Sequence, residues 1–231
     1  MLINTLLSLL RGYHVDLGTV AAQVISILFV ILCILPLHEL AHAWVANKLG
    51  DPTAKLEGRL TFNPLASVDP MGALALLLFG FGWAKPVPVD SRYFRKPKRD
   101  MAITALAGPV SNLLAAFVGA VLVAVMEAFS PYNGFTNFVY NVLWYYVVVN
   151  ISLAVFNLIP MPPLDGSRIV AAFLSDRAMY TYYRYQNLFV MVMFLLLLSG
   201  ALSGPLATAQ TFFANIIFSL ARAPFQLFGL L

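Results

Sequence analysis

The chain of 231 residues is 61% hydrophobic and only 10% charged, a composition that is typical of membrane proteins and leaves little room for a soluble domain. Its net charge of +4 does not indicate nucleic-acid binding, because the basic residues gather beside the apolar segments, where they report membrane topology. The single cysteine, Cys33, excludes an intramolecular disulfide.

The first apolar stretch, residues 2–10, is too short to span a bilayer, so we expect it to lie in the interface or to pack against other helices. Residues 19–47 form the first predicted membrane helix, and no ionisable residue interrupts it between Thr19 and Leu37. Pro36 lies inside this helix. Because proline cannot donate to the carbonyl four residues back, we expect it to loosen the helix at this point.

A polar connection follows this helix and leads to residues 71–82, which are apolar but too short for an ordinary span. The glycines Gly80 and Gly82 then precede Lys85–Val89, where prolines alternate with valines. This alternation predicts an edge strand or a re-entrant segment rather than a helix. Gly80 and Gly82 are positions at which a substrate backbone could approach closely.

Two further spans are predicted at residues 101–127, after a run of basic residues, and at residues 135–160, which prolines end. Residues 186–203 and 206–221 form a hydrophobic pair, and Gly204-Pro205 predicts a break between them.

These segments predict an all-α polytopic membrane protein with about 5–6 membrane segments and a small membrane-associated β or re-entrant element. We expect residues 1–231 to form a single integral-membrane domain.

The motif His38-Glu39-x-x-His42 lies near the end of the first predicted span. On an α-helix, side chains four residues apart share one face, so His38 and His42 can bind one Zn²⁺. Glu39 lies about 100° round the helix, where its carboxylate can act as general base on a water that the metal has acidified. Ionisable groups beside such an apolar run are costly and usually functional.

Two histidines leave a zinc site one protein ligand short. The chain has three histidines, and the third, His14, lies well before the apolar helix, so we expect a carboxylate instead. Asp165 is the best candidate because it also lies at the end of a long apolar run. Asp69 and Asp176 remain as alternatives.

With the distal pattern Asn157-x-x-Pro-x-Pro-x-x-Asp165-Gly, the histidine motif resembles the site-2 protease family of intramembrane zinc metalloproteases. The segments Ala107–Asn112 and Gly82–Val89 match features of the same family. The resemblance covers about residues 20–175, and this combination of motifs is specific where His-Glu-x-x-His alone would not be.

The resemblance implies an intramembrane zinc metalloprotease that hydrolyses peptide bonds within or near transmembrane segments of its substrates. One Zn²⁺ per chain would be held by His38, His42 and Asp165, with Glu39 as the catalytic base. The partners would be transmembrane proteins and the lipid bilayer, with no nucleic acid. The zinc-site core would comprise residues 19–175 and the C-terminal helical pair residues 186–221, a minimal form without accessory domains.

Two asparagines also match family positions. For Asn157 the resemblance implies a role near the substrate carbonyl or the developing oxyanion, and the alternative is an interhelical hydrogen bond. For Asn112 a substrate-binding role is possible, but we favour structural support.

The basic residues predict the orientation. If residues 71–82 do not cross the bilayer, every Lys and Arg except Arg11 falls on one side, which the positive-inside rule makes cytoplasmic. His42 lies about five residues, or about 7–8 Å, from that end of its helix, and Asp165 follows the same end of the third span. We therefore predict a multi-pass protein of a prokaryotic cell membrane, with its active site toward the cytoplasmic side.

Two other classes of protein compete with the protease. A non-catalytic membrane zinc-binding protein or transporter would also place His and Asp in helices, and a catalytically silent scaffold would bind membrane segments without cutting them. Neither class requires Glu39 beside a metal ligand, so the intact motif favours the enzyme.

Overall fold

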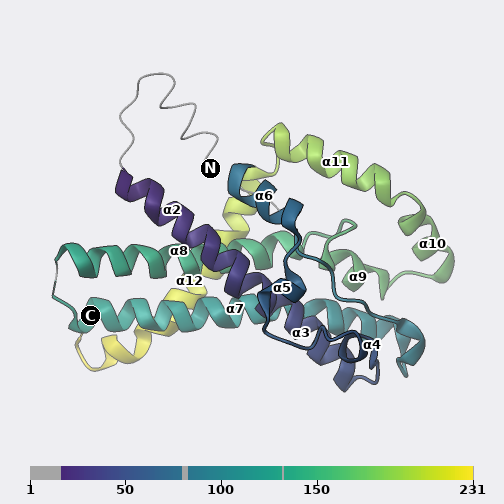
Figure 1. Cartoon of the computed structure of the whole chain (residues 1–231), viewed down its shortest axis with the longest axis horizontal. Coiled ribbons are helices and arrows are strands. Elements are labelled where there is room, and N and C mark those ends of the chain that lie inside the picture. The colour runs from purple at the N-terminus through teal and green to yellow at the C-terminus, as the bar shows by residue number, and fades with distance from the viewer. Residues whose placement is uncertain (1–16, 80–82, 132, 231) are drawn as a thin grey trace.

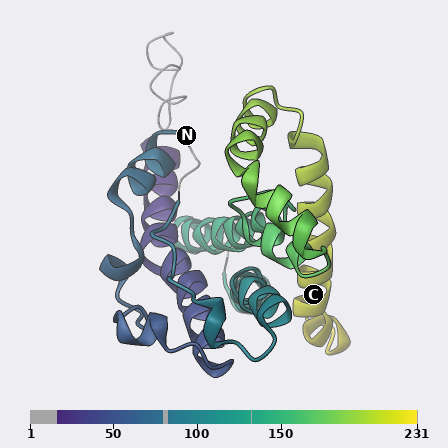
Figure 2. The same ribbon diagram turned by 90° about the vertical axis from the view of Figure 1, so that its right-hand side faces the viewer.

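The computed structural model describes residues 17–79, 83–131 and 133–230, and these residues form a predominantly helical chain (Figures 1 and 2). In chain order, the α-helices are α2 (Leu17–Phe29), α3 (Leu35–Lys48), α4 (Thr53–Leu56), α5 (Pro64–Ser67), α6 (Pro70–Phe79), α7 (Pro97–Phe129), α8 (Gly134–Asn157), α9 (Asp165–Ala171), α10 (Asp176–Arg184), α11 (Gln186–Leu198) and α12 (Ser203–Leu227). A π turn, η1 (Val30–Ile34), and a 3₁₀ turn, η2 (Ser91–Tyr93), complete the set.

The helices α2 and α3 form one long rod that η1 interrupts with a π turn, in which the amide of Leu35 bonds the carbonyl of Val30. The wide turn lies directly before Pro36, whose ring would otherwise crowd the preceding turn. The predicted loosening of the helix before His38 is therefore confirmed, and the motif helix α3 begins at this wide turn.

The antiparallel helices α7 and α8 lie side by side, and α12 crosses them (Figure 1). Their shared core consists of small, branched and aromatic residues: Ala116, Ala120, Val123, Val147, Ile151, Val155, Ile217, Phe218 and Ala221. Trp144 of α8 stacks on Phe218 of α12, with 4.8 Å between ring centroids. This packing holds the last helix against the other two.

Three helices are long and apolar enough to cross a membrane: Ile27–Lys48, Pro97–Phe129 and Gly134–Asn157. The helices α11 and α12 meet at 86° and pass the same test only as a bent pair, which gives at most four spans among the described residues. The structure therefore does not support about 5–6 segments. The reason is length, because the 10 residues of α6 and the 13 of α11 extend only about 15 Å and 20 Å.

The break between α11 and α12 also differs from the prediction. It falls at residues 199–202, where Gly200 adopts φ of +74°, rather than at Gly204-Pro205. Pro205 instead lies in the first turn of α12, where proline is tolerated because that turn's amides lack helical partners.

The predicted β element is reduced to one contact. Val68 and Ala84 form an isolated antiparallel bridge, beside which the Lys85 amide donates to the Ser67 carbonyl at 2.8 Å. The described residues contain no sheet, because Pro86 and Pro88 have no amide to donate and the amides of Val87 and Asp90 bond side chains instead. The candidate positions Gly80 and Gly82 lie outside the described residues.

Charged residues mark the two ends of the helices. Lys98, in the first turn of α7, contacts Asp176 of α10 at 2.7 Å, so these two basic regions share one end of the molecule. Arg222 of α12 instead forms a bidentate pair with Glu127 in the last turn of α7, at 2.6 and 2.9 Å. Since α7 extends about 42 Å between Arg99 and Glu127, the expectation that Arg222 joins the other basic residues is wrong.

Candidate metal centre

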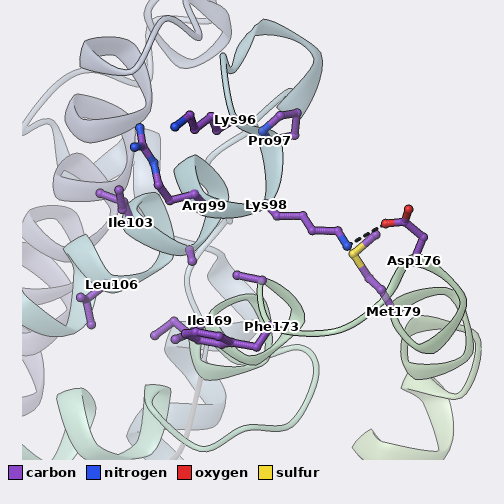
Figure 3. Close-up of a pocket in the computed structure, with 12 residues that line it drawn as sticks. Lys96, Pro97, Lys98, Arg99, Ile103, Leu106, Ile169, Phe173, Asp176 and Met179 are labelled. Atoms are coloured by element: carbon purple, nitrogen blue, oxygen red, sulfur yellow. Dashed lines mark ion pairs between the residues drawn. The ribbon is translucent and has the colours of Figure 1, made fainter.

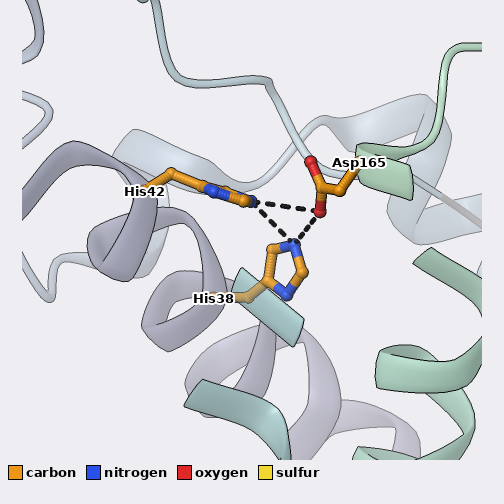
Figure 4. A group of neighbouring side chains, drawn as sticks. All are labelled: His38, His42 and Asp165. Atoms are coloured by element: carbon orange, nitrogen blue, oxygen red, sulfur yellow. Dashed lines mark hydrogen bonds and ion pairs between the residues drawn. The ribbon is translucent and has the colours of Figure 1, made fainter. Parts of the chain in front are cut away.

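Three side chains from two distant parts of the sequence converge beside α7 (Figure 4). His38 and His42 project from one face of α3, as their spacing predicts, and Asp165 projects from the first residue of α9. The prolines that end α8 turn the chain back, so that the start of α9 faces α3.

The three ligand atoms form a nearly equilateral triangle. His38 Nε2 lies 3.2 Å from Asp165 Oδ2, His42 Nε2 lies 3.2 Å from the same oxygen, and the two Nε2 atoms are 3.1 Å apart. Zn²⁺ bonds of about 2.0–2.1 Å at tetrahedral angles place ligand atoms about 3.3 Å apart. The triangle therefore has the dimensions that one zinc ion requires.

All three side chains are shielded from solvent, with 7% of each imidazole and 12% of the Asp165 carboxylate exposed. Burial raises the pKa of Asp165, but its contacts with the imidazoles of His38 and His42 outweigh this effect, and the pKa lies well below its usual value. Among the described residues, this is the cluster of His, Cys, Asp and Glu that could hold a metal ion.

Gly108 of α7 leaves the space that an ion would need. A Cβ atom built at Gly108 would lie 2.4 Å from His42 Nε2 and 2.5 Å from His38 Nε2. A residue with any side chain would therefore fill the position where both nitrogens converge. The residues present fit Zn²⁺ both in donor chemistry and in the room left for it.

His42 is oriented by the backbone of α7. Its Nδ1 atom donates to the carbonyl of Thr104 at 2.7 Å, and because a carbonyl can only accept, the proton lies on Nδ1. The other nitrogen, Nε2, is then free to bind a metal. Thr104 itself is fully buried, which keeps this support out of contact with water.

Glu39 lies beside the triangle without belonging to it. Its side chain is largely buried, and its Oε2 atom accepts a hydrogen bond from the backbone amide of Val87 at 3.1 Å. Val87 lies in the extended segment 84–90, which Arg59 also holds through the carbonyl of Lys85 and which Asp51 holds through the amide of Asp90. The carboxylate is thus positioned by a fixed piece of backbone.

The alternative ligands are occupied elsewhere. Asp69 accepts from the amides of Met71 and Gly72 at the start of α6, and Asp176 pairs with Lys98. The two asparagines differ in their surroundings: Asn157 donates to the Leu153 carbonyl of its own helix at 2.9 Å, whereas Asn112 is completely buried.

Three contributors to this site were not singled out for these contacts by sequence reasoning. Thr104 and Val87 act through backbone atoms, which leave no mark on residue type. Gly108 entered the sequence analysis only as part of the family segment Ala107–Asn112. Its place in Ala107-Gly108-Pro109 was a signal, but the spacing to the histidines could not show that it faces both imidazoles.

A separate cavity of about 760 Å³ lies between α7, α9 and α10 (Figure 3). Lys98 extends across it to Asp176, and its Nζ atom also donates to the Leu174 carbonyl at 2.8 Å. Ile103, Leu106 and Phe173 line its apolar wall. None of the three convergent ligands lines this cavity, so it is distinct from the metal centre.

Comparison with known proteins agrees with this geometry. The sequence pattern that defines peptidase family M50 matches residues 26–200. The chain belongs to peptidase family M50. The motifs that indicated the site-2 protease family therefore occur in a member of M50, and Zn²⁺ is the metal of that family.

Individual M50 relatives include YwhC of Bacillus subtilis, 46% identical over 136 residues, which are 58% of this chain and 62% of YwhC. Rip2 of Mycobacterium tuberculosis is 30% identical over 76% of this chain and 68% of its own length. MJ0392 of Methanocaldococcus jannaschii is 31% identical over 67% of this chain and 36% of its own. All three names include the words "zinc metalloprotease". The match thus spans less than two thirds of YwhC. No solved structure matches the chain significantly.

Proposed function

We propose that this chain is an intramembrane zinc metalloprotease that hydrolyses peptide bonds within or near transmembrane segments of membrane proteins. The observation that carries the proposal is the triangle of His38 Nε2, His42 Nε2 and Asp165 Oδ2, with sides of 3.1–3.2 Å, on a helix apolar enough to span a membrane. Such a site supports hydrolytic chemistry within the membrane, where a substrate segment would itself be embedded.

Zn²⁺ bound by these three residues would supply a Lewis acid that polarises the scissile carbonyl and acidifies water. Glu39 removes the proton from the attacking water, whose oxygen bonds to the carbonyl carbon. As the bond between that carbon and the peptide nitrogen breaks, Glu39 passes the proton to the leaving nitrogen. The Val87 amide supports this role, because it holds one carboxylate oxygen in place and leaves the other for the water.

The substrate helix must unwind before it can react, because the peptide bonds of a helix are already hydrogen-bonded and shielded. Asn157 is the candidate for contacts with the unwound segment, whereas the complete burial of Asn112 supports a structural role for it. Asn157 uses one Nδ2 hydrogen on the Leu153 carbonyl, which leaves its second Nδ2 hydrogen for a substrate carbonyl or oxyanion and its Oδ1 atom for a substrate amide.

The proposed orientation places the metal centre toward the cytoplasmic side. It rests on the basic residues at the start of α7 and on α10, which the contact of Lys98 with Asp176 brings to one end. Arg222 at the opposite end weakens the charge asymmetry by one residue but does not reverse it.

A substrate trap tests the proposal and identifies substrates. The Glu39→Gln variant keeps the ligand set and removes the base, so it should hold uncut membrane proteins in place during cross-linking in native membranes. Captured transmembrane segments should be cleaved by the purified wild-type chain and left intact by His38→Ala. If the wild-type chain cleaves none of the captured proteins, the chain is not the protease proposed.

A further inference from the structure

Asn112 of α7 is an unusual buried residue. It is 0% exposed, and both polar atoms of its carboxamide lack a hydrogen-bond partner among the described residues. Leaving a buried amide unpaired is costly, so native structures nearly always satisfy such groups with protein or ordered water. The burial of Asn112 indicates that its carboxamide has a partner that the described residues do not supply.

The register of two helices places Asn112 beside His38. His42 contacts the Thr104 carbonyl, and both His42 and His38 face the position of Gly108 one turn later, so α3 and α7 run antiparallel. Asn112 lies four residues after Gly108 and therefore on the same face, with Cβ positions about 5–6 Å apart. It occupies the next level of this interface, opposite the turn that precedes His38.

His38 carries a matching unpaired atom. Its Nδ1 is buried and has no hydrogen-bond partner in the part of the chain that the structure describes, whereas Nδ1 of His42 is bonded to Thr104. Histidines that bind a metal almost always donate this second ring hydrogen to a carboxylate, a carbonyl or water, because the bond fixes the tautomer and the ring orientation. One of the two imidazoles has this support and the other lacks it.

We propose that a buried water molecule joins Nδ1 of His38 to the carboxamide of Asn112 and makes Asn112 a positioning residue for the metal centre. The water accepts from Nδ1 of His38 and donates to Asn112 Oδ1, so that Nε2 is left unprotonated for the metal. This water satisfies two of the three unpaired atoms, and Asn112 Nδ2 can donate to a second water in the same site. The inference rests on the proposed function in that it takes His38 to be a zinc ligand.

Substitutions of Asn112 distinguish a carboxamide that supports His38 from one that is buried without a partner. If the carboxamide had no partner, replacing it by the apolar Asn112→Leu would be neutral or stabilising. If it holds the water on His38, the same change frees the imidazole and should weaken zinc binding by about 10–100-fold, the usual cost of removing an outer partner of a ligand. Asn112→Asp retains an acceptor oxygen and should keep affinity near the wild-type value.

Asn150 of α8 offers a matched control. It is also an asparagine with 0% exposure and a buried Oδ1 atom unpaired among the described residues, and its Nδ2 atom donates to the Tyr146 carbonyl of its own helix. Because Asn150 lies on α8, the register of α3 and α7 does not bring it near His38. Asn150→Leu should therefore leave zinc affinity unchanged, even if it alters stability.

The experiment measures zinc affinity of the purified full chain in detergent by competition with a chromogenic chelator. The variants are Asn112→Leu, Asn112→Asp, Asn150→Leu and His38→Ala, each checked for folding by circular dichroism and thermal unfolding. If Asn112→Leu does not fold, Asn112→Ala removes the same carboxamide with a smaller side chain. The inference predicts weakened binding for Asn112→Leu, rescue by Asn112→Asp and no change for Asn150→Leu.

Two results would overturn the inference while leaving the metal site intact: wild-type zinc affinity in folded Asn112→Leu, or an equal loss in Asn150→Leu. Failure of the proposed protease activity would leave all these zinc affinities as predicted and would appear only as absent cleavage, whereas failure of the ligand set would appear as wild-type zinc affinity in His38→Ala. That result would remove the role of Asn112 as well, since there would be no ligand for it to position.

Discussion

Oε2 of Glu39 accepts a hydrogen bond from the backbone amide of Val87 at 3.1 Å. Val87 lies between Pro86 and Pro88, and the residue before a proline is confined to extended backbone. The direction of this amide is therefore fixed by its neighbours. The prolines that suggested an edge strand serve, in the structure, to aim one amide at the carboxylate proposed as the base.

Val87→Pro tests this contact by removing the amide hydrogen while keeping extended backbone. A hydrogen bond to a charged group contributes about 1.5–3 kcal/mol, so we expect kcat to fall by about tenfold or more, with KM and zinc content little changed. Val89→Pro is the matched control, because the Val89 amide bonds none of the catalytic groups described. Equal activity of Val87→Pro and Val89→Pro would show that Glu39 does not need this amide.

Gly108→Ala should abolish stoichiometric zinc binding, because its Cβ would lie 2.4–2.5 Å from the two coordinating nitrogens. Gly119→Ala is a control on the same helix, where the new Cβ would press on the Tyr146 ring at 2.7 Å, far from the metal centre. Overpacking of this kind should destabilise the chain by about 1–3 kcal/mol without loss of zinc. Metal analysis and thermal unfolding of both variants distinguish the two effects. A full zinc content in Gly108→Ala would contradict the claim that Gly108 leaves the space for the ion.

The two ends of the molecule can be identified by cysteine labelling in intact cells, with Cys33 first replaced by Ala. Ser91→Cys and Ser175→Cys should react with a membrane-impermeant reagent only after the cytoplasmic face is opened, because Lys98 and Asp176 tie their regions together. Gln226→Cys should react from outside, because Arg222 lies at the Glu127 end of α7. Labelling of all three positions from one face would disprove this arrangement.

Local sequence patterns were sufficient for the motif helix, for the three long spans and for the pairing of His38 and His42 with Asp165. These features depend on helical spacing and apolar length, which residues alone report. The break after α11 was misplaced because Gly200 and Gly204-Pro205 are both plausible breakers, and only packing decides between them.

The position of Arg222 could not be read from the sequence. Its prediction assumed that α11 and α12 each cross the membrane, whereas the pair bends by 86° and carries Arg222 to Glu127 instead. The supports of the metal centre were hidden for a different reason. Thr104 and Val87 contribute backbone atoms, so the residue types at those positions do not predict the contacts.

The central claim is that two carboxylates have different tasks: Asp165 binds the metal and Glu39 moves the proton. The most direct test compares Asp165→Ala with Glu39→Gln, each purified, analysed for zinc by mass spectrometry and assayed on a model transmembrane substrate. Asp165→Ala should lose both zinc and cleavage, since two imidazoles alone make a weak site. Glu39→Gln should stay folded, keep near one zinc per chain and lose at least about a hundredfold in cleavage rate. Wild-type cleavage by Glu39→Gln would contradict the mechanism, and full zinc in Asp165→Ala would contradict the ligand set.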